Sequence, residues 1–368
     1  MNLISESADK SQKEGKKLQA KGRLKKLLGL WAAALTTGLT LTLPFRAQAG
    51  EIAADLAALR KILPPLSLQG SFYSPAYLRY LAYYHLPAQY AQQAGYLEVH
   101  KGSFKELIFV QYFRPEHPQG TVFLTHGYFV HAGIQHYAVK AFLDLGYAVI
   151  TIDLPGHGLS TGKQADISHF SDYTDTFQAV TEFAQNQVPH PLLAVGHSTG
   201  AAGIWSYLLR TPQHPFQAVV LAAPLVRSHL WELSLAGFTV GRVFLSDLPR
   251  IVRSTTSDPE FMEFVQRDPL QYFNTPVNWV RALIEWNEQV VEGLPPSQLP
   301  TLILQGDRDE VVDWKYNLPF LKRKFPKAQM QMVRGASHDL FWENAQLRQE
   351  IFANIRTFVQ ALPPEKQP

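Results

Sequence analysis

Short apolar runs alternate with amphipathic, helix-forming stretches along most of the chain from Tyr96 onward. Eight of the runs have the length and composition of β-strands: Tyr96–Lys101, Glu106–Phe113, Thr121–Thr125, Tyr147–Ile152, Leu192–Val195, Ala218–Ala222, Thr301–Gln305 and Gln329–Val333. Strands that alternate with helices are joined by crossover connections, which make neighbouring strands parallel. The pattern therefore predicts an α/β fold with a mainly parallel, eight-stranded sheet flanked by helices.

Residues 227–298 interrupt this alternation, and the interruption is too long for an ordinary loop. Its large apolar residues are Leu230, Trp231, Leu233, Leu235, Phe238, Val240, Val243, Phe244, Trp279, Leu283 and Trp286. We expect most of them to pack this insertion onto the rest of the protein. The α/β region is thereby divided into a first part, 95–226, and a second part, 299–368.

The segment 50–94, which precedes the first strand, has a different composition. A helical pattern over Glu51–Pro64 is followed by Ser71–Tyr90, where tyrosines recur at spacings of three and four. Such a stripe on a helix is more often core packing than a ligand platform. The alternative is a surface close to a membrane, because tyrosine suits a boundary between apolar and aqueous phases.

The first 49 residues carry nine Lys/Arg against three Asp/Glu, and an apolar tract extends from Leu27 to Phe45. Ala47-Gln48-Ala49 then offers small residues at the positions that a signal peptidase reads. This pattern predicts a signal peptide cleaved after Ala49 and an exported protein, periplasmic or secreted. The alternative is an uncleaved membrane anchor, because the tract is near the lower length limit for a membrane span.

The charge balance and the cysteine content narrow the classes of partner and of covalent modification that the chain could have. The formal net charge of +3 is concentrated in those first 49 residues, and the remainder carries 25 basic and 28 acidic residues. Nothing in this balance indicates a nucleic-acid surface. The chain contains no cysteine, which excludes disulfides and a lipid-modified cysteine after the signal peptide.

The fifth predicted strand leads directly into Gly196-His197-Ser198-Thr199-Gly200, and a helix-forming stretch follows. A bare Gly-x-Ser-x-Gly match is usually an ordinary turn. Between a buried strand and a helix, however, it is typical of the nucleophile elbow of an α/β-hydrolase, where backbone strain exposes the serine hydroxyl. Glycines at the flanking positions remove Cβ atoms that would crowd the turn. The context predicts Ser198 as a catalytic nucleophile.

An acid and a histidine follow in the chain order that this fold requires. The strand Thr301–Gln305 leads into Asp307, Asp309, Glu310 and Asp313, four acids close together. We select Asp309, because Gly-x-x-Asp-x-Val-Val places it at the turn with apolar residues behind it; Asp307 or Glu310 would be solvated loop charges. After the last strand comes His338, which we predict to be the catalytic base.

Two backbone N–H groups are needed to stabilise the oxyanion of such a reaction. One is expected from Thr199, which follows the nucleophile, and the other from Tyr128 in the loop after Thr121–Thr125, with Phe129 as the alternative. We interpret His126 and His131 in the same loop as structural or entrance residues. A metal site is not expected because the histidines lack a matching set of ligands, and no cofactor is required.

These motifs together resemble the monoglyceride lipase and lysophospholipase branch of the α/β-hydrolases. The resemblance covers roughly residues 95 to 360 and rests on His126-Gly127 with His131 and Tyr137, on the segment Asp153–Gly162 followed by Phe170 and Tyr173, on the elbow at Ser198, and on Asp268-Pro269-Leu270. It implies an α/β-hydrolase fold in which residues 227–298 form a helical cap inserted after the sixth strand. The chain departs from the branch at Tyr128-Phe129-Val130, where small or acidic residues are common.

The resemblance implies a serine hydrolase that cleaves carboxylic esters, with monoacyl lipids such as lysophospholipids or monoacylglycerols as expected substrates. An apolar cap would form a tunnel for the acyl chain, and the cap or the tyrosine-rich segment would be the places for peripheral contact with a membrane. The alternatives are an acyltransferase or a short-chain esterase or thioesterase with the same residues. Peptide hydrolysis and a non-catalytic lipid-binding protein are weaker interpretations.

Overall fold

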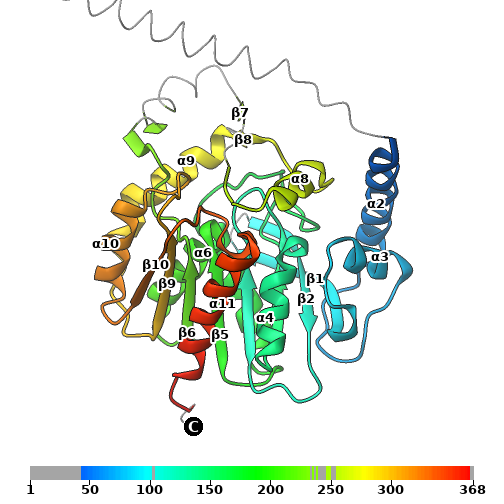
Figure 1. Cartoon of the computed structure of the whole chain (residues 1–368), viewed down its shortest axis with the longest axis horizontal. Coiled ribbons are helices and arrows are strands. Elements are labelled where there is room, and N and C mark those ends of the chain that lie inside the picture. Colours follow the sequence, from blue (N-terminus) through cyan, green and yellow to red (C-terminus); the bar gives the residue numbers. More distant parts are fainter. Residues whose placement is uncertain are drawn as a thin grey trace, which may run out of the picture. The chain divides into compact units, whose positions relative to one another are not determined.

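The computed structural model describes residues 43–101, 104–232, 234–235, 238, 246–249 and 254–364 (Figure 1). The chain divides into two compact units, residues 1–48 and 49–368. Most of the predicted signal peptide, residues 1–42, therefore lies outside the described residues, as do Leu233, Val240, Val243 and Phe244 of the insertion. In the described ranges, no helix combines the length and apolarity that crossing a membrane requires.

All eight predicted strands are present in one sheet. They are β1 (Ala91–Lys101), β2 (Phe104–Phe113), β3 (Thr121–Thr125), β4 (Ala148–Ile152), β5 (Leu192–His197), β6 (Phe216–Ala222), β9 (Thr301–Gly306) and β10 (Gln329–Val333), in the order β1-β2-β4-β3-β5-β6-β9-β10. Strand β2 pairs antiparallel with β1 and β4, and the other pairs are parallel. The predicted α/β-hydrolase fold with a mainly parallel sheet is confirmed.

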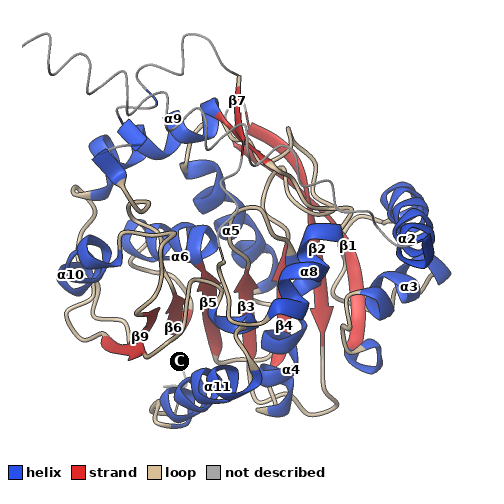
Figure 2. Cartoon of the chain, turned by 45° about the horizontal axis from the view of Figure 1, so that its top comes forward, coloured by secondary structure: helices blue, strands red, loops and turns tan. Residues whose placement is uncertain are grey.

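Side chains of the central strands alternate between two apolar layers, one on each face of the sheet. In β3, Val122 and Leu124 belong to one layer and Phe123 to the other. The first layer also holds apolar residues of α4 (His136–Asp144) and α11 (Ala345–Gln360), and the second holds those of α5 (Ser171–Ala184), α6 (Ser198–Arg210) and α10 (Trp314–Lys324). Figure 2 shows these helices packed around the sheet. Both faces of the central strands are buried, which explains why their sequences are mostly apolar.

The segment before β1 forms two helices, α2 (Leu43–Ile62) and α3 (Pro75–Tyr83), and a short 3₁₀ turn, η1 (Ala88–Tyr90). Helix α2 begins earlier than the predicted Glu51, so the predicted cleavage site after Ala49 lies within it. The tyrosine stripe is core packing: Tyr77, Tyr80 and Tyr84 are fully buried. The alternative of a tyrosine-rich membrane surface is therefore wrong for these three residues.

The insertion after β6 contains α8 (Pro259–Arg267), α9 (Val277–Trp286) and the π-helical turn η3 (Asn287–Val291). It also contains a short antiparallel pair, β7 (Asp247–Pro249) and β8 (Asn274–Pro276). The cap was predicted to be helical, and this strand pair is an addition to its helices. Trp231, Trp279, Leu283 and Trp286 are buried against the layer that contains α5 and α6.

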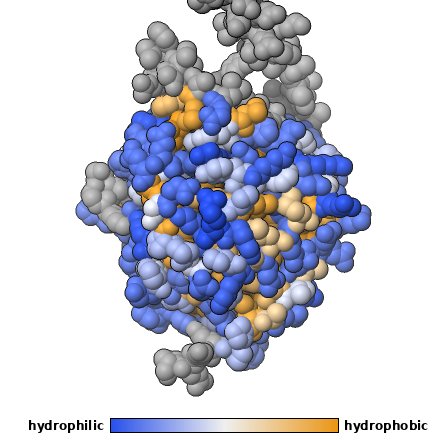
Figure 3. Space-filling view, turned by 90° about the vertical axis from the view of Figure 1, so that its left-hand side faces the viewer, coloured by the Kyte–Doolittle hydropathy of each residue, from blue (hydrophilic) through white to orange (hydrophobic). Residues whose placement is uncertain are grey.

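The surface of the described residues exposes large apolar side chains only in scattered positions. They are Ile62, Tyr73, Leu78, Leu107, Leu230, Phe273, Val290 and Met332. The face in Figure 3 is mainly polar, with apolar residues gathered in small groups. Scattered apolar residues of this kind are normal for a folded surface.

Candidate active site

Ser198 lies at the junction of β5 and α6 in a strained backbone conformation, with φ of +52°. Two glycines make this turn feasible. A Cβ atom at Gly200 would lie 2.3 Å from the carbonyl oxygen of His126, and one at Gly196 would lie 2.7 Å from the backbone of Ala201. Both distances are too short for any side chain. The Gly-x-Ser-x-Gly spacing is therefore required by packing at this turn.

Ser198, His338 and Asp309 form a continuous hydrogen-bonded chain. The distance from His338 Nε2 to Ser198 Oγ is 2.9 Å, and that from His338 Nδ1 to Asp309 Oδ2 is 2.7 Å. The three residues follow strands β5, β9 and β10, whose carboxyl ends meet at one edge of the parallel sheet. All three side chains are buried. The fold thus brings together residues that are up to 140 positions apart in sequence.

Asp309 is held in an environment that favours its charged form. Its Oδ1 accepts hydrogen bonds from the N–H groups of Val311 (2.7 Å) and Val312 (3.1 Å), and its Oδ2 also accepts one from Gln305 Nε2 (2.8 Å). Burial opposes ionisation, but the neighbouring His338 and these N–H donors together lower the pKa of Asp309 below its ordinary value. A carboxylate at this position can orient His338 and stabilise its protonated form.

The competing acids are placed differently. Asp307 is exposed and accepts a hydrogen bond from Gly335 N–H (2.7 Å). Asp313 caps the N-terminus of α10 through Tyr316 N–H, and Glu310 is exposed. The acid seen hydrogen-bonded to His338 is Asp309, the predicted one.

The loop after β3 packs directly against Ser198. A Cβ atom at Gly127 would lie 3.1 Å from Ser198 Cβ. The preceding His126 is fully buried; its Nδ1 lies 2.7 Å from the Gly127 carbonyl oxygen, and its Nε2 accepts the Leu154 N–H at 2.9 Å. Burial and the nearby His157 hold the pKa of His126 well below its usual range. His126 is therefore structural, and Tyr128 N–H and Thr199 N–H stay our prediction for the oxyanion hole.

The side chain of Tyr128 belongs to the contact between this loop and the cap. Its ring stacks on Trp279 of α9, with ring centroids 4.0 Å apart, and its hydroxyl donates to the Ala165 carbonyl at 2.6 Å. Trp279 is itself fixed by a 3.0 Å hydrogen bond from its Nε1 to the Tyr173 hydroxyl. Tyr128, one of the bulky residues at which the chain departs from the lipase branch, thus joins the β3 loop to the cap.

Sequence reasoning missed a role for His197. Its Nε2 donates to the backbone carbonyl of His338 at 2.9 Å, which fixes the loop that carries His338, while its buried Nδ1 has no hydrogen-bond partner among the residues that the structure describes. Burial, together with the neighbouring His338, lowers the pKa of His197 to about 4. Its position inside the elbow motif was the available signal, but the partner carbonyl lies 141 residues away.

His197, His338 and Asp339 are close enough for their ligand atoms to surround a metal ion, since these atoms lie within 4.8 Å of one another. Both nitrogens of His338 are already engaged, however, with Ser198 and Asp309. Engagement of both nitrogens is the arrangement used for proton transfer from a serine.

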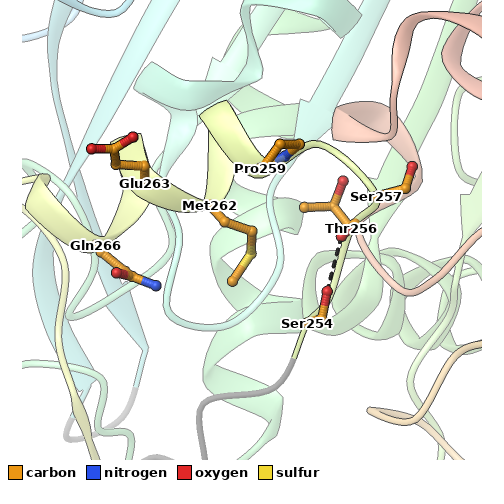
Figure 4. Close-up of a pocket in the computed structure, with 7 residues that line it drawn as sticks. All are labelled: Ser254, Thr256, Ser257, Pro259, Met262, Glu263 and Gln266. Carbon is orange, nitrogen blue, oxygen red and sulfur yellow. Dashed lines mark hydrogen bonds between the residues drawn. The ribbon is translucent and has the colours of Figure 1, made fainter. Parts of the chain in front are cut away.

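A cavity of about 590 Å³ is lined by α8 and by the segment that precedes it (Figure 4). Met262, Glu263 and Gln266 of α8 line one side, and Ser254, Thr256, Ser257 and Pro259 line the rest. Thr255, in the same segment, makes two hydrogen bonds to Asp339. Its Oγ1 donates to Asp339 Oδ2 at 2.5 Å, and its backbone carbonyl accepts the Asp339 N–H at 2.7 Å. The cavity wall is thereby bonded to the residue that follows His338.

Comparison with known proteins agrees with this geometry. The model of the family described as serine aminopeptidase, S33, matches residues 116–345, more than half of the chain. The chain belongs to this family of α/β-hydrolases. The matched region contains the elbow, Asp309 and His338, whereas α2 and α3 lie outside it.

Individual relatives define the branch of the hydrolase family. A monoacylglycerol lipase of Mycolicibacterium smegmatis is 28% identical over 238 residues, which cover 62% of this chain and 84% of that protein. Phospholipase YtpA of Bacillus subtilis is 24% identical over 258 residues, covering 67% and 96%. A solved monoglyceride lipase variant from Saccharomyces cerevisiae has the same fold, with a TM-score of 0.61 at 16% identity over 73% of this chain and 96% of that one. This hydrolase is an ester hydrolase of the monoglyceride lipase and lysophospholipase branch.

Acid is expected to destabilise this hydrolase through its buried neutral histidines. Burial lowers the pKa of His157 and of His197 to about 4 and holds that of His126 well below its ordinary value, whereas unfolded histidine titrates near 6.5. As the pH falls from about 6.5 to about 4, the unfolded chain binds protons that the folded protein excludes, and each group lowers the free energy of unfolding by up to about 1.4 kcal/mol per pH unit. His131 acts in the opposite sense. Burial lowers its pKa, but the neighbouring Asp268 raises the pKa by more, so the net shift is upward.

Burial also lowers the pKa of His136 to about 4 and lowers that of His214, so the histidines that acid destabilises outnumber His131. The expected net effect is a lower urea midpoint at about pH 5 than at about pH 7.5, followed by circular dichroism. Equal midpoints at the two pH values would contradict the neutral state of these histidines.

Proposed function

We propose that the protein hydrolyses carboxylic esters of single-chain lipids, monoacylglycerols or lysophospholipids, through Ser198, His338 and Asp309. The observation that carries the proposal is the hydrogen-bonded chain from Ser198 Oγ through His338 to Asp309 at a strained strand-to-helix turn. A carboxylate, an imidazole and a serine hydroxyl in this order are the arrangement that activates serine for attack on a carbonyl.

In the proposed reaction, His338 Nε2 takes the proton of Ser198 as Oγ attacks the ester carbonyl. The N–H groups of Tyr128 and Thr199 stabilise the oxyanion, aided by the N-terminus of α6. Protonated His338 then gives its proton to the leaving alcohol, and an acyl-enzyme remains on Ser198. Water, deprotonated by His338, releases the fatty acid, while Asp309 keeps the imidazole in the useful tautomer.

Three features support a lipid substrate. The relatives of the chain include proteins named as lipases of monoacylglycerol and as a phospholipase. The cap stacks Trp279 on the Tyr128 ring of the β3 loop, and we propose that an acyl chain would lie along this apolar side of the cap. The cavity beside α8 offers hydroxyl, amide and carboxylate groups, which suit a polar head group. The cap is also our proposed surface for contact with a membrane.

Export is part of the proposal and rests on the first 49 residues alone. The basic start, the apolar tract and Ala47-Gln48-Ala49 support a signal peptide, with an uncleaved anchor as the alternative. Expression in a bacterial host, fractionation and mass measurement of the product distinguish the two. A periplasmic or secreted product that begins at Gly50 is the expected result, and a full-length product in the membrane fraction would favour the anchor.

The substrate class is tested by incubating the full chain with a monoacylglycerol and, separately, with lysophosphatidylcholine, and by measuring released fatty acid. We expect release from at least one lipid and none from a Ser198→Ala sample treated in the same way. Added glycerol or lysolipid, followed by product analysis, separates hydrolysis from acyl transfer. Cleavage of short soluble esters without action on either lipid would retain the mechanism and reject the lipid substrate.

A further inference from the structure

A buried carboxylate in the cap, Asp268, connects three parts of the chain that are distant in sequence. Its Oδ2 lies 2.7 Å from His131 Nε2 in the loop after β3. Its Oδ1 accepts the Tyr84 hydroxyl at 2.8 Å and the Leu270 N–H at 2.9 Å. The side chains of His131 and Asp268 are both fully buried. The carboxylate is thus satisfied by donors from the β3 loop, from the N-terminal segment and from the cap itself.

The hydrogen bonds of His131 also show which of its two ring nitrogens donates to Asp268. Its Nδ1 accepts the Gly133 N–H at 3.1 Å, so the proton resides on Nε2 and is donated to Asp268. The next backbone N–H, that of Ala132, donates to the buried Asp153 at 2.6 Å. His131 stands three residues after Tyr128. The end of the loop that carries the proposed oxyanion donor is therefore tied to the cap through Asp268.

Tyr84 brings the N-terminal segment into this connection. It is the residue that caps the C-terminus of α3, and it is fully buried. Its ring meets the edge of His131 with centroids 4.8 Å apart, and that of Phe264 on α8 with centroids 6.1 Å apart. One side chain from outside the family-matched region therefore contacts the β3 loop, helix α8 and the cap carboxylate.

We propose that Tyr84 is a positioning residue, through which the segment α2–α3 holds the cap and the β3 loop in the arrangement that the reaction needs. The inference rests on the proposed function for its catalytic consequence. The physical reason is the isolation of Asp268 from water: a buried carboxylate that loses a donor regains stability by moving toward solvent or by drawing in water. Either movement shifts His131, and with it the loop that packs against Ser198.

The test compares two conservative variants, one at Tyr84, which follows the last residue of α3, and one at Tyr77 within α3. Tyr84→Phe removes the hydroxyl that donates to Asp268 and keeps the ring. Tyr77→Phe is the matched control, because Tyr77 is equally buried and, among the described residues, its hydroxyl accepts a hydrogen bond from Gln111 Nε2 (3.1 Å) and not from the cap. For both full-length variants we measure the rate of Ser198 labelling by a fluorophosphonate and the hydrogen exchange of residues 127–135 and of α8.

The expected result for Tyr84→Phe is labelling slowed by about tenfold, since small misplacements of catalytic groups cost that much or more. Exchange in both segments should be faster than in wild type, and Tyr77→Phe should match wild type in both measurements. In an Asp268→Asn background, Tyr84→Phe should add no further loss of labelling, because it acts through that carboxylate. Equal effects of the two tyrosine variants, or a full additional loss in that background, would overturn the proposal.

The two measurements separate this inference from the proposed function. If the wild-type protein does not react with the fluorophosphonate, the proposed nucleophile is wrong, and the exchange comparison alone decides the role of Tyr84. Unchanged exchange in Tyr84→Phe would overturn that role even where labelling of wild type is rapid.

Discussion

Replacing Ser198 by alanine is expected to lower the rate of ester hydrolysis by about 10⁴-fold or more, because it removes the proposed nucleophile. The hydroxyl lies 2.9 Å from His338 Nε2 at the strained turn, and alanine leaves the rest of the site in place. Binding and oxyanion stabilisation would remain, so a small residual rate is expected rather than none. The measurement is the initial rate with a short chromogenic ester and with the preferred lipid.

The matched control for this variant is Ser206→Ala. Ser206 lies on the same helix, α6, and its buried hydroxyl has no hydrogen-bond partner among the described residues. Its removal should leave the rate within about twofold of wild type. Wild-type activity in Ser198→Ala would refute the proposed mechanism.

Replacing Asp309 by asparagine is expected to lower kcat by about 10⁴-fold, by analogy with the loss of the orienting carboxylate in other serine hydrolases. An amide at this position favours the tautomer of His338 that carries its proton on Nε2, which can no longer accept the proton of Ser198. The carboxylate lies 2.7 Å from His338 Nδ1 and is otherwise saturated by Gln305, Val311 and Val312. The N–H groups of Val311 and Val312 would then donate to the amide oxygen of asparagine, which has nearly the same shape as the carboxylate. We therefore expect a loss of activity with the fold retained.

Asp307→Asn and Asp313→Asn are the controls for the choice among neighbouring acids. Asp307 is exposed and bonds to Gly335 N–H, and asparagine at 313 can still cap α10. Both variants should keep kcat within about threefold of wild type. A large loss in either one, with Asp309→Asn unaffected, would move the orienting role to that acid.

The strands and the elbow were predictable because local chemistry determines them. The central strands are mostly apolar, since both faces of the sheet are covered, and β3 and β10 begin and end where the pattern placed them. Helix boundaries were less accurate: α2 begins at Leu43 rather than Glu51, and α6 begins at Ser198 itself. The pattern of side chains marks the buried face of a helix but not the turn at which it starts.

The insertion shows a second limit of sequence reasoning. Its apolar residues indicated packing onto the core, and Trp279 and Trp286 are buried as expected. The short pair β7–β8 was not predicted, because each strand has only three residues and too few positions to display a period of two.

The sequence by itself determined the fold class, the order of the strands along the chain and the candidates Ser198, Asp309 and His338, because each leaves a local pattern of spacing or periodicity. Only the tertiary structure decided which acid meets His338, that His197 supports its loop, and that Tyr84 and His131 share Asp268. The physical reason is that these contacts join segments far apart in the chain; Tyr84 and Asp268 are 184 residues apart. Their pairing depends on how the cap and the N-terminal helices pack, and no local pattern records that packing.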